Sequence, residues 1–138
     1  MKDKVFLDTN ILIYAYSQEE ERKQNIALEL IDTYSQEIVI STQVINELTN
    51  ILFKKFKIDA ETIKKTIIEL DSVFNIEKFD IVTQIKAVEI KEKYKLQFYD
   101  SLILATALEN RCTILFSEDM QEGQVIENTL TIVNPFKT

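Results

Sequence analysis

Four short apolar runs, separated by longer stretches with helical periodicity, constrain the fold of this chain more than any other feature of its sequence. They cover residues 4–7, 38–40, 113–116 and 131–133 and are rich in β-branched and aromatic side chains. Runs without a polar residue at every second position are typical of strands in a parallel sheet that is covered on both faces. The sequence therefore predicts an α/β fold.

The stretches between these runs carry apolar residues at helical spacing. In the segment 61–74, for example, they recur at Ile63, Ile67, Leu70 and Phe74. We expect helices over residues 11–16, 19–34, 42–53, 61–74, 80–94 and 100–110, a brief strand over 75–77, and Asn10 or Thr9 as the cap of the first helix. Because strands and helices alternate, we predict a three-layer α/β/α sandwich with a mostly parallel central sheet.

The length of 138 residues suits one domain, and no linker, repeat or low-complexity stretch divides the chain. We predict a single domain over residues 1–138. No apolar stretch approaches the roughly 20 residues that span a bilayer, and the first apolar run is broken by Asp8 and Asn10. We therefore expect no membrane span, no signal peptide and a cytoplasmic location.

The composition excludes several common catalytic sites. The chain has no His, one Cys (Cys112) and one Gly (Gly123). It cannot contain a Ser-His-Asp triad, a zinc site built from His or several Cys, or a glycine-rich loop that cradles phosphate groups. Any chemistry must come from carboxylates, hydroxyls and amines.

Four carboxylates adjoin the predicted sheet. Asp8 comes directly after the first strand, and Asp119 lies just past the strand 113–116. Glu47 lies at the rim of the apolar face of the helix 42–53, and Asp100 opens a helix on the side that it shares with apolar residues. Ligands of open α/β sheets bind beyond the carboxyl ends of the strands. We therefore predict that these four acids meet at one edge of the sheet.

Four carboxylates in one place need a counter-charge. Two like charges about 4 Å apart repel each other by roughly 4 kcal/mol at an effective dielectric constant near 20. Oxygen ligands suit Mg²⁺ or Mn²⁺, and such an ion would offset the repulsion, activate a water molecule and stabilise the leaving oxygen of a phosphodiester. Asn10 and Ser117 are suited to orient these acids or a substrate.

Each acid also has an ordinary explanation when it is taken alone. Asp8 and Asp100 could cap helices, and Glu47 could be a solvated helix residue. Asp119 could belong to a turn, and Glu118 could replace it as the acid that points inward. The metal-site hypothesis therefore depends on the four acids together.

Four segments of the chain resemble the PIN domain, and especially the VapC-like toxins of prokaryotic toxin–antitoxin pairs. They read V-F-L-D-T-N-I-L at 5–12, S-T-Q-V-I-N-E at 41–47, Y-D-S-L-I-L-A-T-A at 99–107 and I-L-F-S-E-D-M at 114–120. The similarity extends over nearly the whole chain, through Val133–Phe136. D-T-N alone is a weak motif, whereas the four segments in this order are specific.

The resemblance implies a metal-dependent ribonuclease with RNA as its substrate and Mg²⁺ or Mn²⁺ as its cofactor. By residue matching, the metal-site acids would be Asp8, Glu47, Asp100 and Asp119, and the supporting polar groups Asn10 and Ser117. Members of the family usually form homodimers, and a cognate antitoxin typically covers the active site. The chain departs from the family pattern at Ser101, where Ala is common, and at Glu122, where a related subgroup often has a His that could contact RNA.

The formal charge is −7, from 16 Lys and Arg against 23 Asp and Glu, so an enzyme that binds RNA must concentrate its Lys residues. Two groups fit this requirement: Lys54, Lys55 and Lys57 beside Phe53 and Phe56, and Lys91, Lys93 and Lys95 beside Tyr94. They are either phosphate contacts with aromatic stacking or solvated faces whose aromatic rings belong to the core. The segment 51–58 is also a candidate for contact with a second copy or an antitoxin.

Hydrolysis of RNA phosphodiester bonds is the function that these features favour. A phosphatase or phosphoacceptor domain with Asp8 as nucleophile fits less well, because Asn10 stands where a D-x-D phosphatase has its second acid. A catalytically silent PIN-like module that binds RNA or protein is the alternative from another functional class. Retention of all four acids argues against that module.

Overall fold

The computed structural model describes residues 3–137 as an alternating series of strands and helices. In chain order these are β1 (Val5–Leu7), α1 (Thr9–Tyr16), α2 (Glu21–Tyr34), β2 (Ile38–Ser41), α3 (Thr42–Lys54), α4 (Ala60–Val73), β3 (Asn75–Glu77), α5 (Ile81–Tyr94), α6 (Phe98–Glu109), β4 (Ile114–Phe116), β5 (Val125–Ile126) and β6 (Leu130–Val133). A single 3-10 turn, Ser35–Glu37, leads into β2. The predicted alternation of strands and helices is therefore confirmed.

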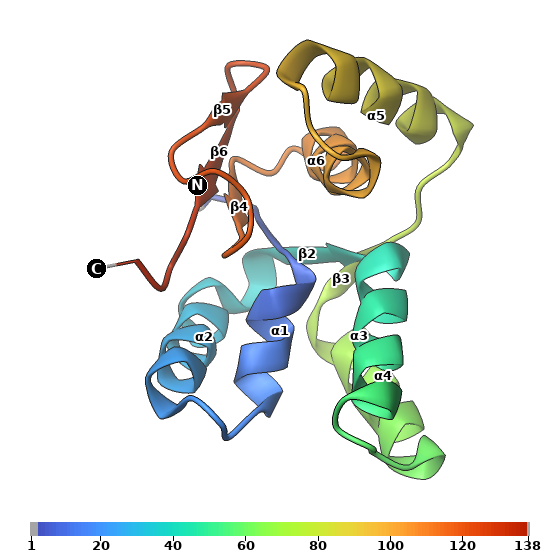
Figure 1. The fold of residues 1–138 in the computed structure, drawn as a ribbon, viewed down its shortest axis with the longest axis vertical. Coiled ribbons are helices and arrows are strands. Elements are labelled where there is room, and N and C mark those ends of the chain that lie inside the picture. Colours follow the sequence, from blue (N-terminus) through green and yellow to red (C-terminus); the bar gives the residue numbers. More distant parts are fainter. Residues whose placement is uncertain (1–2, 138) are drawn as a thin grey trace.

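The six strands form one sheet in the order β3-β2-β1-β4-β6-β5. All neighbours run parallel except β5, which pairs antiparallel with β6. In Figure 1, helices α1 to α4 lie on one side of the sheet and α5 and α6 lie on the other. The predicted α/β/α arrangement with a mostly parallel central sheet is thus confirmed.

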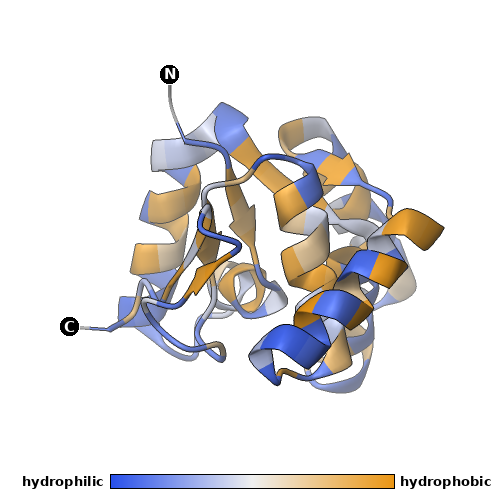
Figure 2. Ribbon diagram, turned by 90° about the horizontal axis from the view of Figure 1, so that it is seen from above, coloured by the Kyte–Doolittle hydropathy of each residue, from blue (hydrophilic) through white to orange (hydrophobic). Residues whose placement is uncertain are grey.

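The core surrounds the two central strands, β1 and β4. All three residues of β1 have an exposed fraction of 0%, and Leu115 of β4 is equally buried. Figure 2 shows these strands as a hydrophobic layer between helices of mixed hydropathy. The predicted apolar stripe of the segment 61–74 also packs inward, since Ile63, Leu70 and Phe74 are buried. Burial of both sheet faces explains why the strands lack alternating polar residues.

Three local predictions differ from the structure. Helix α1 begins at Thr9 and is capped by Asp8, whose extended backbone and carboxylate meet the needs of a cap, so the prediction of Asn10 or Thr9 is wrong. Helix α6 begins at Phe98, which packs on the core, so Asp100 lies within the first turn and neither opens nor caps the helix. The two-residue strand β5 was not predicted, because it is too short to show a pattern.

The chain makes its sharp turns with little glycine. Five other residues adopt positive φ angles, namely Lys57, Lys95, Arg111, Glu127 and Asn128, while Gly123 has φ 83°.

No helix within residues 3–137 is long and apolar enough to cross a membrane. That residues 1–138 form a single domain stays a prediction, and its ends, residues 1–2 and 138, lie outside the described part.

Candidate functional site

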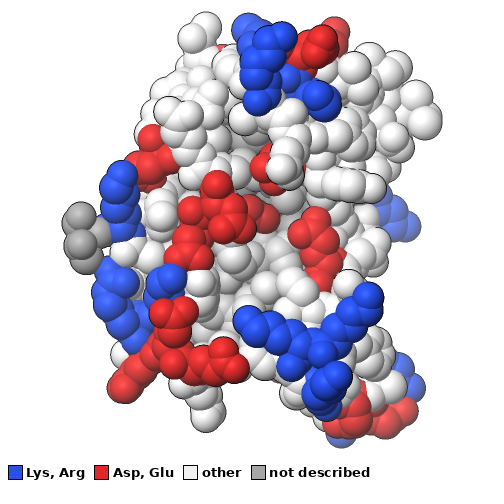
Figure 3. Space-filling model, viewed as in Figure 1, with Lys and Arg blue, Asp and Glu red and all other residues white. Residues whose placement is uncertain are grey.

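A cleft of about 620 Å³ opens at the carboxyl ends of the central strands. The side chains of all four acids singled out from the sequence line it: Asp8 after β1, Glu47 on α3, Asp100 on α6 and Asp119 after β4. Figure 3 shows acidic side chains gathered in the middle of this face of the molecule. The structure therefore brings the four acids to one cavity from four separate elements.

Asp8 is the most deeply placed of these acids, with an exposed fraction of 6%. Its Oδ1 accepts a hydrogen bond of 2.7 Å from the backbone N–H of Thr9, and its Oδ2 accepts one of 2.8 Å from the hydroxyl of Ser117. Burial raises the pKa of Asp8 to about 6. The two hydrogen bonds oppose this shift, whereas the charges of Glu47 and Asp100 add to it. Asp8 is thus both the cap of α1 and a wall of the cleft.

Ser117 lies fully buried beneath this wall. While its hydroxyl donates to Asp8, its Oγ accepts bonds of 3.3 Å from the backbone N–H groups of Asp119 and Met120. One hydroxyl therefore connects the carboxylate at the end of β1 with the backbone that carries the acid after β4.

Glu47 is held by two residues to which the sequence assigned no role at the site. Its Oε2 accepts a bond of 3.1 Å from the Thr9 hydroxyl, and its Oε1 accepts one of 2.9 Å from Nε2 of Gln43. The same Nε2 also donates to the backbone carbonyl of Tyr99 at 3.3 Å. Gln43 lies four residues before Glu47 on α3, so helical spacing alone could have indicated this pair.

Asp119 is exposed at the rim of the cleft and is paired with Asn10. Nδ2 of Asn10 donates to Oδ2 of Asp119 at 3.0 Å, and its Oδ1 accepts a bond of 3.3 Å from the backbone N–H of Glu118. Asn10 therefore fixes the position of the Asp119 carboxylate and of the backbone N–H just before it, that of Glu118.

Glu118 does not replace Asp119 in the cleft. Its carboxylate pairs with Lys23 and accepts a bond of 2.6 Å from the hydroxyl of Tyr14. Burial favours a higher pKa for Glu118, but the bonds from Lys23 and Tyr14 outweigh it and lower the pKa. The alternative that Glu118 is the inward acid is therefore wrong: it anchors the segment after β4 to α1 and α2.

Asp100 is half-buried on the first turn of α6. Burial raises its pKa, and the nearby charges of Asp119 and Glu47 raise it further. Within residues 3–137, no side chain donates a hydrogen bond to this carboxylate. Asp100 therefore carries the least compensated charge of the four.

The donor set of the cleft fits a hard divalent cation. It consists of carboxylate oxygens, which Mg²⁺ and Mn²⁺ prefer. Each bonded oxygen of Asp8 keeps a second lone pair for a ligand. In the described part of the chain, however, no three acids stand close enough to form a ready-made ligand group. The residues fit such an ion by type, while their carboxylates stand apart, as mutual repulsion favours.

The two Lys groups differ in their surroundings. Lys54, Lys55 and Lys57 are exposed at the end of α3, where Figure 3 shows basic side chains gathered. Lys93 instead donates to Glu127 at 2.7 Å, so part of the second group is neutralised.

The carboxylate of Glu122 accepts a bond from the backbone N–H of Asn134 and lies outside the lining of the cleft.

Comparisons with known proteins identify the class of this fold. The PIN domain family model matches residues 5–122, and the chain belongs to that family. A toxin–antitoxin complex from Klebsiella pneumoniae contains a chain with 25% identity and a TM-score of 0.75, and the match covers 97% of this chain and 99% of that one. No protein with a curated functional description matches.

Two further solved structures share the fold. The first is VapC20 of Mycobacterium tuberculosis, described as a Sarcin-Ricin loop cleaving toxin, with a TM-score of 0.69, 18% identity and coverage of 83% of this chain and 91% of that one. The second is VapBC2 from Rickettsia felis bound to a promoter DNA fragment, with a TM-score of 0.65, 23% identity and coverage of 93% and 96%. The fold of this chain is therefore that of VapC-type PIN proteins.

Proposed function

We propose that the chain is a Mg²⁺- or Mn²⁺-dependent endoribonuclease, and that it is the toxin of a toxin–antitoxin pair acting in the cytoplasm. The observation that carries the proposal is the convergence of four carboxylates from four elements on one open cleft of a PIN domain. The cleft has no His and no Cys among its lining residues, so hydrolysis would depend on carboxylates.

Asp8, Glu47, Asp100 and Asp119 would hold the cation. When bound, it supplies a Lewis acid that activates water and stabilises the leaving oxygen of a phosphodiester. The protein's part is to fix these acids before substrate arrives: Ser117 orients Asp8, Thr9 and Gln43 orient Glu47, and Asn10 orients Asp119. Removal of such polar partners commonly lowers metal affinity or activity by roughly 10- to 100-fold.

Cleavage of single-stranded RNA by the purified, partner-free chain tests the proposal. We expect cleavage with Mg²⁺ or Mn²⁺, none with EDTA, and none from Asp100→Asn. Glu109→Gln is the matched control, because it removes an exposed acid from the same helix outside the cleft lining. RNA binding without cleavage in the native chain would favour the silent module, and a phosphoryl adduct on Asp8 would favour the phosphatase.

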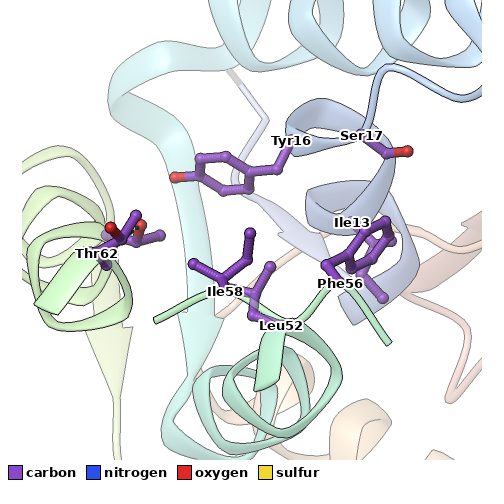
Figure 4. Close-up of a pocket in the computed structure, with 8 residues that line it drawn as sticks. Ile13, Tyr16, Ser17, Leu52, Phe56, Ile58 and Thr62 are labelled. Carbon is purple, nitrogen blue, oxygen red and sulfur yellow. Dashed lines mark hydrogen bonds between the residues drawn. The ribbon is translucent and has the colours of Figure 1, made fainter. Parts of the chain in front are cut away.

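An apolar groove beside the cleft supports the antitoxin as a partner (Figure 4). Side chains of α1 face the end of α3 across this cavity of about 150 Å³, which is lined by Ile13, Tyr16, Leu52, Phe56 and Ile58 among others. Ile13 lines both the groove and the acidic cleft, so the two adjoin each other at this side chain. We propose that an antitoxin segment lays apolar residues in the groove and reaches the acids with a basic side chain.

Loss of the antitoxin complex on Phe56→Ser would support this placement. The experiment is co-purification of the chain with a co-expressed candidate antitoxin. Phe53→Ser is the control, because Phe53 is an exposed neighbour outside the groove lining. Equal retention of the partner by both variants would contradict the placement.

The outer face of α5 supports a homodimer. Four apolar side chains, Ile81, Val82, Ile85 and Val88, are exposed by 68, 66, 58 and 50% on this one helix. We propose that a second copy covers them. Light scattering should then give a dimer for the native chain and a monomer for Ile85→Glu. Ile68→Glu, at an equally exposed apolar position on α4, should stay dimeric.

A further inference from the structure

Tyr99 is an exposed aromatic ring at the start of a helix whose middle is wholly buried. Residues 101–107 of α6 are all buried, whereas Tyr99 is exposed by 69%. It lines the acidic cleft and directly precedes Asp100 on the first turn of α6. The fold therefore presents a large aromatic surface to solvent beside the carboxylates.

The position of Tyr99 is fixed from two sides. Its backbone carbonyl accepts the bond from Nε2 of Gln43, the same atom that donates to Glu47. Its ring contacts that of Phe98 with centroids 5.8 Å apart and planes inclined by 65°, and Phe98 in turn packs against the core. Tyr99 is thus an exposed ring whose backbone shares a hydrogen-bond donor with a cleft acid.

We propose that Tyr99 forms a nucleobase subsite, where its ring stacks on a base of single-stranded RNA next to the scissile phosphate. This inference rests on the proposed ribonuclease function and adds the group that the enzyme grips. Stacking suits a cleft of this charge, because an aromatic face attracts a base without adding to the repulsion between carboxylates and phosphates. Phe79, which lines the same cleft, extends its apolar wall.

Steady-state cleavage of a short single-stranded RNA with Mg²⁺ tests the subsite. We expect Tyr99→Ala to raise KM by roughly 5- to 150-fold, the range that base–aromatic stacking gives, with a smaller effect on kcat. Tyr99→Phe should restore KM to nearly the native value, because it keeps the ring. Equal KM values for the native chain and Tyr99→Ala would overturn the subsite while leaving the ribonuclease function in place.

The absence of Trp from the chain allows a readout that does not depend on cleavage. In the Tyr99→Trp, Asp100→Asn double variant, the single Trp should be quenched by RNA in Mg²⁺. An abasic ribose-phosphate chain of the same length should not quench it. Ile68→Trp with Asp100→Asn is the matched control, since Ile68 is as exposed as Tyr99, lies outside the cleft lining and belongs to neither Lys group, so it should report no quenching.

Two results would overturn the inference whatever the enzyme does. One is equal quenching at positions 99 and 68, which would show that the base contact is not specific to the cleft. The other is a loss of antitoxin binding, or of the dimer, in Tyr99→Ala without any change in RNA binding. That result would assign the exposed ring to a protein contact.

Discussion

Ser117 and Asp8 stand at the ends of the neighbouring strands β4 and β1, and the serine hydroxyl donates a 2.8 Å hydrogen bond to the aspartate carboxylate. Both side chains are buried. A buried carboxylate has lost its hydrogen bonds to water, and the Ser117 hydroxyl supplies a donor in their place. Because Ser117 also accepts the N–H of Asp119, the first and last acids of the cleft are held by one hydroxyl.

Ser117→Ala should lower the free energy of unfolding by about 1–3 kcal/mol. The substitution removes the hydroxyl that donates to Oδ2 of Asp8 and accepts from two backbone N–H groups. Urea unfolding in EDTA measures this loss. Ser101→Ala is the control: its hydroxyl is as buried but donates only to the carbonyl of Gln97. A smaller loss is expected there, and equal losses would contradict the role given to Ser117.

The metal-free chain should become less stable as the pH rises from 5 to 7. Asp8 has a pKa of about 6 in the folded chain against an ordinary value of 3.8, so the folded state binds the proton more tightly. Its ionisation then costs about 3 kcal/mol at pH 7, of which about 1–1.5 kcal/mol is regained by pH 5. Urea unfolding in EDTA at both pH values checks this, and Asp8→Asn should reduce the slope, leaving only the contribution of Asp100, whose pKa is also raised. A native stability that rises with pH in this window would refute the assignment.

Asn10→Ala should weaken Mn²⁺ binding about 10-fold and reduce cleavage in parallel. The amide holds Asp119 through a 3.0 Å bond and the next backbone N–H through a 3.3 Å bond, so its loss frees an exposed acid to move. Calorimetric titration measures the affinity. Asn50→Ala, at an exposed position on α3, should bind Mn²⁺ as the native chain does.

The fold could be predicted because its central strands β1 and β4 are apolar runs and most of its helices have apolar stripes. Both signals come from burial against the sheet, and local sequence records them directly. Strand β5 could not be predicted from these signals. Val125 and Ile126 pair with β6 through a turn at Glu127 and Asn128, both of which have positive φ angles. A glycine would have indicated such a turn, whereas Glu at this φ depends on tertiary contacts.

The four acids could be predicted because each has a fixed place relative to a strand or helix end. Most of their partners could not be derived in the same way. Helical spacing brings Gln43 to Glu47, but Thr9 approaches Glu47 only once α1 packs beside α3, and nothing local distinguishes Glu118 from Asp119. The distinction comes from Lys23 on α2, nearly a hundred residues earlier, which pairs with Glu118 and leaves Asp119 at the cleft.

Glu127→Gln should loosen the β5–β6 hairpin. Its carboxylate accepts bonds from Lys93 at 2.7 Å, Lys86 at 2.9 Å and the Tyr94 hydroxyl at 3.0 Å, and these bonds lower its pKa to about 2. Because the folded pKa lies below the ordinary value of 4.5, the stabilisation is present above pH 4.5 and is lost as the pH falls towards 2. Hydrogen exchange at the amides of β5 should therefore accelerate in the variant at pH 7. Unchanged protection there would show that the ion pairs do not hold the hairpin.

Mn²⁺ should raise the melting temperature of the native chain more than that of Asp100→Asn. The order of the two melting temperatures should therefore differ with and without the metal. Without metal, the variant lacks one of the mutually repelling charges that raise the pKa values of Asp8 and Asp100, so it should melt at the higher temperature. An ion that binds only the folded state adds about 2.7 kcal/mol to the free energy of unfolding when its concentration is 100 times its dissociation constant. This moves the melting midpoint by several degrees in a domain of this size. The native chain should gain this shift and the variant little of it, whereas Glu109→Gln should follow the native chain. A shift of equal size in the native chain and in Asp100→Asn would place the ion elsewhere, and no shift in either would mean that the acids hold no ion without RNA.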